Sequence, residues 1–325
     1  MSILFHAASS EELEQGIRFR TYLKYLQAFS DLSTQNAAYP ESLIRGLTGS
    51  VPFKAINGGK CKDIPRLGQL LRNAWFTELQ LNLPSKFPDL VPYSIHWAGV
   101  QAYYSVYLLL RAYFYASGQD VPNKHAHTLG AIANEIRSKN AMFPSPWNAF
   151  CDDSPAQPIY GGIPVGVSMV DVSALKNYDL GSAWSWHTMF LKTTRQRQLE
   201  KLVDDWKAQQ KRRRVSPKVK AALIRNLNPT TAFACLYRLR IRSNYEDADS
   251  FLLGALQAAP AEAEQFHGSI CNIVWDAGLI LEALIARHIG KKAYKEILAG
   301  FVENKRLEFS RSLAFARWTL LASSW

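Results

Sequence analysis

The stretch that decides the fold is residues 93–117, which read YSIHWAGVQAYYSVYLLLRAYFYAS. Large side chains follow a period of about 3.6 residues along it, and Gly118 comes next as a residue that ends helices. The sequence therefore predicts a long helix here. We expect the periodic positions to be core rather than a ligand site; they are Trp97, Val100, Tyr104, Tyr107, Leu108, Arg111, Phe114 and Tyr115.

Helical periodicity extends over most of the remaining chain. The expected helices cover residues 11–32, 125–138, 184–210, 217–227, 231–253, 262–289 and 291–321. Two stretches break the pattern. Residues 33–67 contain three prolines and are predicted to be loop with short helices, and residues 144–180 are rich in Pro, Gly and β-branched residues and predict a loop or a small β-hairpin. The pattern favours an all-α fold with an irregular insertion.

The composition predicts a folded, soluble, basic protein. Of the 325 residues 48% are hydrophobic and 20% are charged, which is enough apolar material for a substantial core and argues against disorder. No uninterrupted apolar stretch reaches the ~18 residues that a membrane-spanning helix needs, and residues 1–14 lack the pattern of a signal peptide. We expect a cytoplasmic protein without membrane contact.

The four cysteines predict neither a zinc site nor a disulfide framework. They lie far apart and form no Cys-x-x-Cys pair; they are Cys61, Cys151, Cys235 and Cys271. The sequence also has no His-Glu-x-x-His motif or EF-hand spacing. We expect reduced thiols, no metal and no cofactor.

The positive charge is concentrated in one segment. The chain has a formal net charge of +11, and residues 192–242 alone contain 15 Lys and Arg against three acidic residues, so the other 274 residues sum to about −1. Clustered cations pair with phosphates, which dominate sequence-independent affinity for nucleic acids. The alternative is a solvated basic helix that pairs with acidic side chains of its own chain or of a partner. The predicted nucleic-acid-binding residues are Lys211, Arg212, Arg213, Arg214, Lys218, Lys220 and Arg225.

One local motif adds a resemblance. Residues 237–249 read YRLRIRSNYEDAD, and upstream stand QAYYSVYL at 101–108, Gly118, Val121-Pro122 and KHAH at 124–127. In this order the pieces resemble the HEPN domain, the nucleotide-binding helical bundle of higher eukaryotes and prokaryotes. The resemblance covers about residues 92–140 and 228–258.

The resemblance implies a division of the chain into three parts. Residues 1–91 would be an N-terminal helical and loop region, residues 92–258 a HEPN-like antiparallel bundle interrupted by an insertion at about 141–227, and residues 259–325 additional C-terminal helices. HEPN bundles have four or five helices and are often homodimers. They occur in bacterial antiviral, toxin–antitoxin and RNA-processing systems, and many are metal-independent endoribonucleases.

The sequence departs from the HEPN catalytic motif, an Arg followed four to six residues later by a His. None of the seven histidines stands at that distance from an arginine. The residues found where the motif is expected, together with two histidines that could supply the missing imidazole, form the candidate catalytic set: Arg238, Arg242, Asn244, Tyr245, His125 and His127.

Cleavage of RNA without a metal needs a general base and a general acid, which His provides near neutral pH because its ordinary pKa is about 6.5. Tyr245 is a poor substitute with an ordinary pKa of about 10, whereas Arg238 or Arg242 could hold a phosphate. A purely structural role is equally consistent with the motif, since Arg242 and Glu246 have the spacing of a helical ion pair.

Three functions therefore stay open. The first is a binding module that holds RNA, another nucleic acid or a nucleotide through residues 192–242 and the motif, within a bacterial defence or toxin–antitoxin system. The second is a divergent HEPN endoribonuclease. The third is a scaffold subunit whose basic segment docks on an acidic partner protein.

Overall fold

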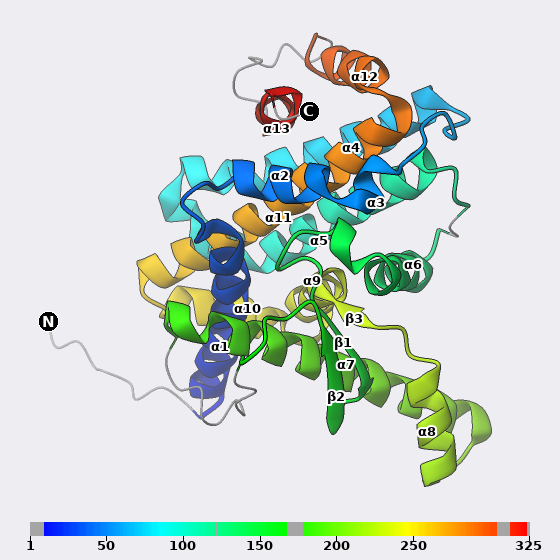
Figure 1. Ribbon diagram of the computed structural model, residues 1–325. Helices are drawn as coiled ribbons and strands as arrows, with labels where there is room; N and C mark the ends of the chain where they lie inside the picture. The colour runs from blue at the N-terminus through cyan, green and yellow to red at the C-terminus, as the bar shows by residue number, and fades with distance from the viewer. Residues whose placement is uncertain (1–9, 121–122, 168–177, 304–312, 324–325) are drawn as a thin grey trace, which may run out of the picture.

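The computed structural model describes residues 10–120, 123–167, 178–303 and 313–323, and Val121-Pro122 of the HEPN-like pieces lie outside these ranges. The described residues form an all-α fold with one small sheet, which confirms the predicted fold class (Figure 1). The helices are α1 (Ser10–Thr34), α2 (Glu41–Gly49), α3 (Val51–Lys54), α4 (Ile64–Asn82), α5 (Val91–Ala116), α6 (His125–Ser138), α7 (Ala183–Gln210), α8 (Pro217–Arg225), α9 (Ala232–Ile241), α10 (Ala248–Gln257), α11 (Pro260–Ile289), α12 (Lys291–Glu303) and α13 (Leu313–Ser323).

Short turns join several of these helices. The 3₁₀ turns are η1 (Leu83–Lys86), η2 (Pro88–Leu90), η3 (Asn140–Met142) and η5 (Leu180–Ser182), and η6 (Arg242–Glu246) is a π-helical turn. The sheet has the order β2-β1-β3 and is antiparallel, with β1 (Phe150–Ser154), β2 (Gln157–Gly161) and β3 (Thr230–Thr231). The β-hairpin expected within residues 144–180 is therefore present as β1 and β2, while residues 168–177 lie outside the described ranges.

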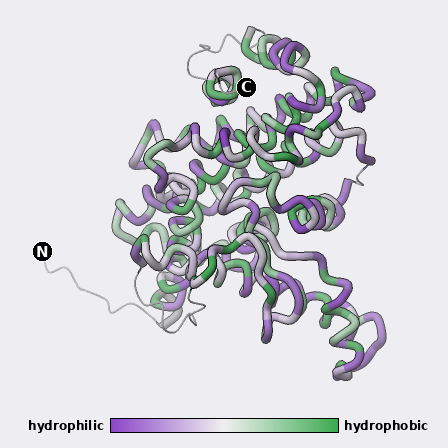
Figure 2. The backbone as a smooth tube through the Cα atoms, in the orientation of Figure 1, coloured by the Kyte–Doolittle hydropathy of each residue, from purple (hydrophilic) through white to green (hydrophobic). Residues whose placement is uncertain are grey.

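Helix α5 is the centre of the fold, packed between α4, α11, α9 and α10. A single hydrophobic cluster extends from Phe19 on α1 through α5 to Leu321 on α13, so it draws residues from all three parts expected from the sequence. Figure 2 shows the apolar residues gathered toward this centre. Residues from all three expected parts therefore share one core.

The aromatic face of α5 is not all core, contrary to the sequence prediction. Trp97 is 50% exposed, and Tyr93 one turn before it is 60% exposed. Near these two residues the helix buries small side chains, among them Ala98 and Gly99, because a neighbouring segment approaches it closely on that side. A periodicity counted on large side chains does not detect such contacts, so the predicted face was partly wrong.

The helix expected over residues 231–253 is interrupted, which corrects the sequence prediction. Helix α9 ends at Ile241, the turn η6 follows, and α10 begins at Ala248. The buried Ser243 of η6 lies against α5 at Gly99, where an added Cβ would lie 2.8 Å from the Ser243 hydroxyl. The close approach of two helices thus accompanies a local change of helical register.

The C-terminal helices are anchored by a buried charge. Residues 291–321, expected as one helix, include α12 and most of α13, and residues 304–312 lie outside the described ranges. The guanidinium of Arg317 on α13 is fully buried and pairs with Glu78 on α4 and Glu282 on α11. Helix α11 is long and apolar enough to cross a membrane by composition, and the relevant window is 83% buried inside the fold, as in the core helix of a globular protein.

Candidate nucleic-acid interface

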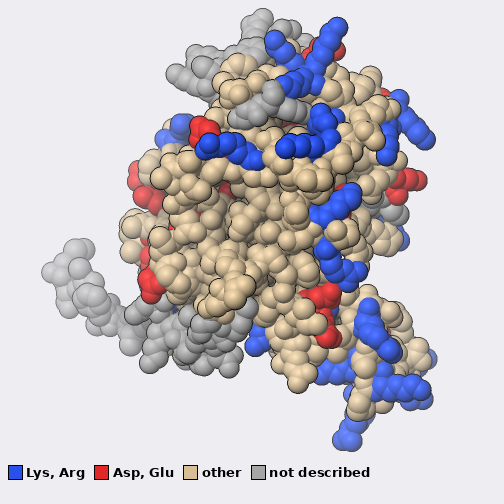
Figure 3. Space-filling view, in the orientation of Figure 1, with Lys and Arg blue, Asp and Glu red and all other residues tan. Residues whose placement is uncertain are grey.

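The most basic part of the predicted segment 192–242 forms a projecting helical hairpin. We call residues 200–225 the basic arm: the second half of α7, a loop at 211–216 and α8. Figure 1 shows α8 standing out from the body, and Figure 3 shows Lys and Arg side chains gathered on this projection. All seven predicted phosphate-binding residues are exposed. Within the part of the chain that the structure describes, none of them makes an ion pair.

Local sequence explains the turn of the arm. Lys211 ends α7 in the left-handed backbone conformation, with φ of 51°. Helix α8 then begins with Ser216 as its N-cap, whose hydroxyl accepts a hydrogen bond from the backbone N–H of Val219 at 3.4 Å, and with Pro217 in the first turn. No residue of α8 is fully buried, so the arm is held mainly at its base.

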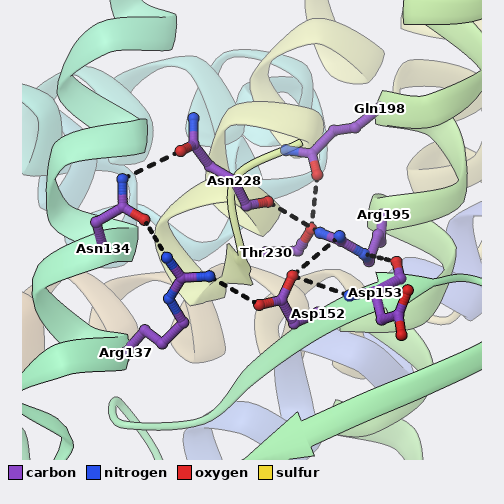
Figure 4. Close-up of polar contacts among 8 residues, drawn as sticks. All are labelled: Asn134, Arg137, Asp152, Asp153, Arg195, Gln198, Asn228 and Thr230. Carbon is purple, nitrogen blue, oxygen red and sulfur yellow. Dashed lines mark hydrogen bonds and ion pairs between the residues drawn. The ribbon is translucent and has the colours of Figure 1, made fainter. Parts of the chain in front are cut away.

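A polar network holds the base of the arm to the body (Figure 4). The fully buried Arg195 side chain of α7 donates to the Asp153 carbonyl at 2.5 Å and to the Asn228 carbonyl at 2.9 Å. It also pairs with Asp152 at 3.1 Å, and Asp152 pairs in turn with Arg137 on α6. The network thus joins α7, the β-hairpin, the segment before β3 and α6 at the point where the arm leaves the body.

A groove of about 560 Å³ lies between the arm and the turn of the β-hairpin. Its lining is mixed, with apolar Val203, acidic Asp204 and basic Lys220 among the residues. Of the seven predicted phosphate-binding cations, Lys220 lines this groove and the other six do not.

Arg238 and Arg242 lie in a second pocket, of about 450 Å³, between α7 and α9. The guanidinium of Arg238 donates to the hydroxyls of Thr193 at 2.7 Å and Thr194 at 3.2 Å. Four acidic and four basic residues line this pocket: Glu200, Asp204, Asp205 and Glu246, with Arg197, Lys201, Arg238 and Arg242. The pocket is electrostatically balanced, unlike the arm.

The charge of Arg242 is compensated within the fold. It pairs with Glu246 at 2.9 Å, as the sequence predicted, and with Asp247. Burial by itself disfavours the charged guanidinium, but the hydrogen bond to Asp247 raises the pKa of Arg242 above its ordinary value. Arg242 is therefore a paired structural cation rather than one free to hold a phosphate.

Tyr245 and His125 lie elsewhere, next to an arginine that the sequence analysis did not select. Tyr245 is 65% exposed, and its hydroxyl accepts from Arg240 at 3.4 Å. His125 shares a hydrogen bond of 2.7 Å with the hydroxyl of Tyr103. Burial, and then the positive charge of Arg240, lower the pKa of His125. These groups surround Arg240 and not Arg242.

The other two candidates have no polar contact with this group. His127 is exposed on the first turn of α6, and Asn244 is half-buried with no side-chain hydrogen bond among the described residues. The six candidate catalytic residues therefore do not meet in one open groove.

The π-helical turn explains why Arg240 was missed. In a continuous α-helix, residues 238, 242 and 245 share one face, since they are spaced i, i+4 and i+7. The turn η6 adds a residue, seen in the hydrogen bond from the Asp247 N–H to the Arg242 carbonyl at 2.9 Å. This turns Tyr245 toward Arg240, five residues earlier. The only sequence signal for Arg240 was its place in the Arg-rich motif.

No family model, curated protein or solved structure matches the chain. The HEPN resemblance accordingly stays a prediction carried by the motif residues. Among the described residues, no group of three or more His, Cys, Asp and Glu could hold a metal ion.

Proposed function

We propose that the protein binds nucleic acid through the basic arm. The observation that carries the proposal is the set of seven exposed cations on one projecting hairpin, none of which has a carboxylate partner among the described residues. The bulk of the chain is nearly neutral, so this charge is not part of a generally basic surface. Lys and Arg side chains of this kind neutralise phosphates and release counterions whatever the base sequence.

The geometry favours binding over cleavage. Arg242 is paired with two carboxylates, and Tyr245 and His125 lie beside Arg240 instead. A metal-independent ribonuclease needs its proton donor, proton acceptor and phosphate-binding cation within reach of one phosphate. The proposed role is consequently that of a binding protein, as in the HEPN-like defence and toxin–antitoxin assemblies that the motif resembles.

The experiment measures affinity against salt. The full chain is titrated into fluorescent RNA and DNA of arbitrary sequence, and the logarithm of the association constant is plotted against the logarithm of salt concentration. The arm variant carries Gln at Lys211, Arg212, Arg213 and Arg214. We expect its slope to be flatter by about one unit for each phosphate that the arm no longer neutralises.

The matched control removes the same number of exposed cations elsewhere, by Gln at Arg45, Lys62, Arg66 and Lys86. We expect this variant to keep most of the wild-type slope. Salt-independent binding, no binding, or an equally flattened slope in the two variants would contradict the proposal. Capture of an acidic protein by a chain that binds no nucleic acid would favour the scaffold function instead.

A further inference from the structure

Arg240 lies in an aromatic enclosure that we call the Arg240 cage: Arg240 with Tyr104, Tyr237 and Tyr245. Its guanidinium carbon is 5.3 Å from the ring centre of Tyr104, 5.9 Å from that of Tyr237 and 5.2 Å from that of Tyr245. One guanidinium nitrogen donates to the hydroxyls of Tyr104 at 3.0 Å and Tyr245 at 3.4 Å. Cation–π contacts of this kind fix the position of the charge.

The charge of Arg240 has no carboxylate partner in the described part of the chain. Its Nε atom is buried without any hydrogen bond. The arginines that form ion pairs there show the contrast; they are Arg18, Arg20, Arg137, Arg195, Arg197, Arg242 and Arg317. A half-buried cation without a counter-ion attracts an anion more strongly than a fully solvated one.

The cage offers two further features to a ligand. The Tyr104 and Tyr245 hydroxyls accept from Arg240, so each retains its own proton to donate to an anionic oxygen. The Tyr245 ring packs on the Arg240 guanidinium, and the residue is still 65% exposed, so part of its side chain is accessible to a flat group. An anion attached to an aromatic ring fits both features.

We propose that the Arg240 cage holds one unpaired nucleotide of the bound nucleic acid, with its phosphate against Arg240 and its base stacked on Tyr245. The inference rests on the proposed function, in which the arm supplies sequence-independent affinity. Bases within a duplex are stacked on their neighbours and cannot reach a ring on a protein surface, whereas unpaired bases can. The cage therefore adds a preference for single-stranded regions.

The experiment compares an oligothymidylate with the same strand annealed to oligodeoxyadenylate, each titrated with the full chain at one salt concentration. Tyr245→Ala removes an exposed ring, so the fold is retained. We expect it to lower affinity for the single strand about tenfold and to leave affinity for the duplex unchanged. Arg240→Gln is expected to act in the same direction.

Two controls separate stacking from other effects. Tyr245→Phe keeps the ring and is expected to retain most of the single-strand affinity. Phe87→Ala removes another exposed aromatic side chain, 55% exposed on the turn before α5, and is expected to change neither affinity.

The outcomes distinguish the two proposals. If wild-type protein binds both oligonucleotides and Tyr245→Ala weakens neither, or weakens both equally, the cage inference is wrong while binding by the arm stands. If wild-type protein binds neither, the proposed function itself fails.

Discussion

The basic arm and the Arg317 cluster show two opposite uses of charge in one chain. The guanidinium of Arg317 is fully buried and is held by Glu78 at 2.5 Å and 2.8 Å and by Glu282 at 2.6 Å. The seven predicted phosphate-binding cations of the arm are exposed and have no such partner among the described residues. The charge that supports the fold thus comes with its counter-ions, and the charge without counter-ions is free for a ligand.

Two further side chains donate hydrogen bonds to the carboxylate of Glu282 in the Arg317 cluster. Trp75 donates to Glu282 at 2.8 Å, and the Tyr294 hydroxyl donates to the other oxygen of the same carboxylate at 2.7 Å. Gly278 on α11 makes room for the guanidinium, since an added Cβ would lie 2.8 Å from the Arg317 Cζ atom. Removing any one member therefore leaves a buried polar group without its partner.

The largest expected effect is that of Arg317→Met. The substitution leaves Glu78 and Glu282 buried without a cation, so we expect it to lower the free energy of unfolding by about 3–5 kcal/mol. Urea denaturation of the full chain measures this. Adding Glu78→Gln and Glu282→Gln to the same variant should restore part of the stability, because no uncompensated charge then remains. If Arg317→Met alone were as stable as wild type, the buried ion pairs would not support the fold, and the contrast with the basic arm would be wrong.

A second test uses a buried carboxyl that has no cation beside it. Burial raises the pKa of Asp276 from 3.8 to about 7, although hydrogen bonds from Tyr39 and Ser33 act in the opposite direction. The folded protein then keeps a proton that the unfolded chain releases. The contribution of the Asp276 carboxyl to the free energy of unfolding is fully present below pH 3.8 and is lost as the pH rises to about 7.

Asp276→Asn should remove this pH dependence. Relative to wild type, its free energy of unfolding should rise by about 4 kcal/mol in total across that pH range, judged from 1.36 kcal/mol for each unit of pKa shift. The exposed Asp89 provides the control, since Asp89→Asn should leave the profile unchanged. Parallel profiles for wild type and Asp276→Asn would mean that the carboxyl is not protonated in the folded protein.

The ion pair at the base of the arm is less buried than those of Arg317 and more buried than the cations at the end of the arm. Its loss should therefore lower the free energy of unfolding by a smaller amount than the loss of Arg317. Arg195 is fully buried but pairs with Asp152, whose side chain is 22% exposed. We expect Arg195→Met to cost about 2–3 kcal/mol, since two backbone carbonyls also lose their donor. Arg197→Met on the same helix, where the side chain is 57% exposed, should be close to neutral in urea denaturation. Equal costs for the two would show that the network does not hold the arm.

Local patterns in the sequence predicted much of the fold. Helix α6 begins and ends where the periodicity placed it, at His125 and Ser138, and α7 starts one residue before the expected position. The hairpin of β1 and β2 follows the change in composition after residue 144. These features depend on neighbouring residues, so the sequence contains enough information for them.

Features that depend on distant contacts could not be predicted in this way. Arg317 and Glu78 are 239 positions apart, and nothing in either local sequence marks them as partners. The interruption of the helix at Ser243 similarly accompanies the approach of Gly99 from α5.

The same difference between local features and features that depend on the three-dimensional structure applies to the candidate site. The concentration of charge could be read from the sequence because it is a local property of residues 211–225, and helices were expected over residues 184–210 and 217–227. Their arrangement as a projecting hairpin depends on tertiary contacts and was not predicted. The grouping of Arg238, Arg242 and Tyr245 assumed a regular helix. With the π-helical turn, Tyr245 contacts Arg240 instead. Turns of this type are frequent at functional sites.

The most direct test of the central claim measures binding and stability on the same arm variant, with Gln at Lys211, Arg212, Arg213 and Arg214. Because these side chains have no partner among the described residues, we expect the free energy of unfolding to be unchanged. The salt dependence of nucleic-acid affinity should be flatter by about one unit for each phosphate that is no longer neutralised. Two results would contradict the claim that the charge of the arm binds a ligand and does not stabilise the fold. One is a lower free energy of unfolding in the variant, and the other is a salt dependence of its nucleic-acid affinity equal to that of wild type.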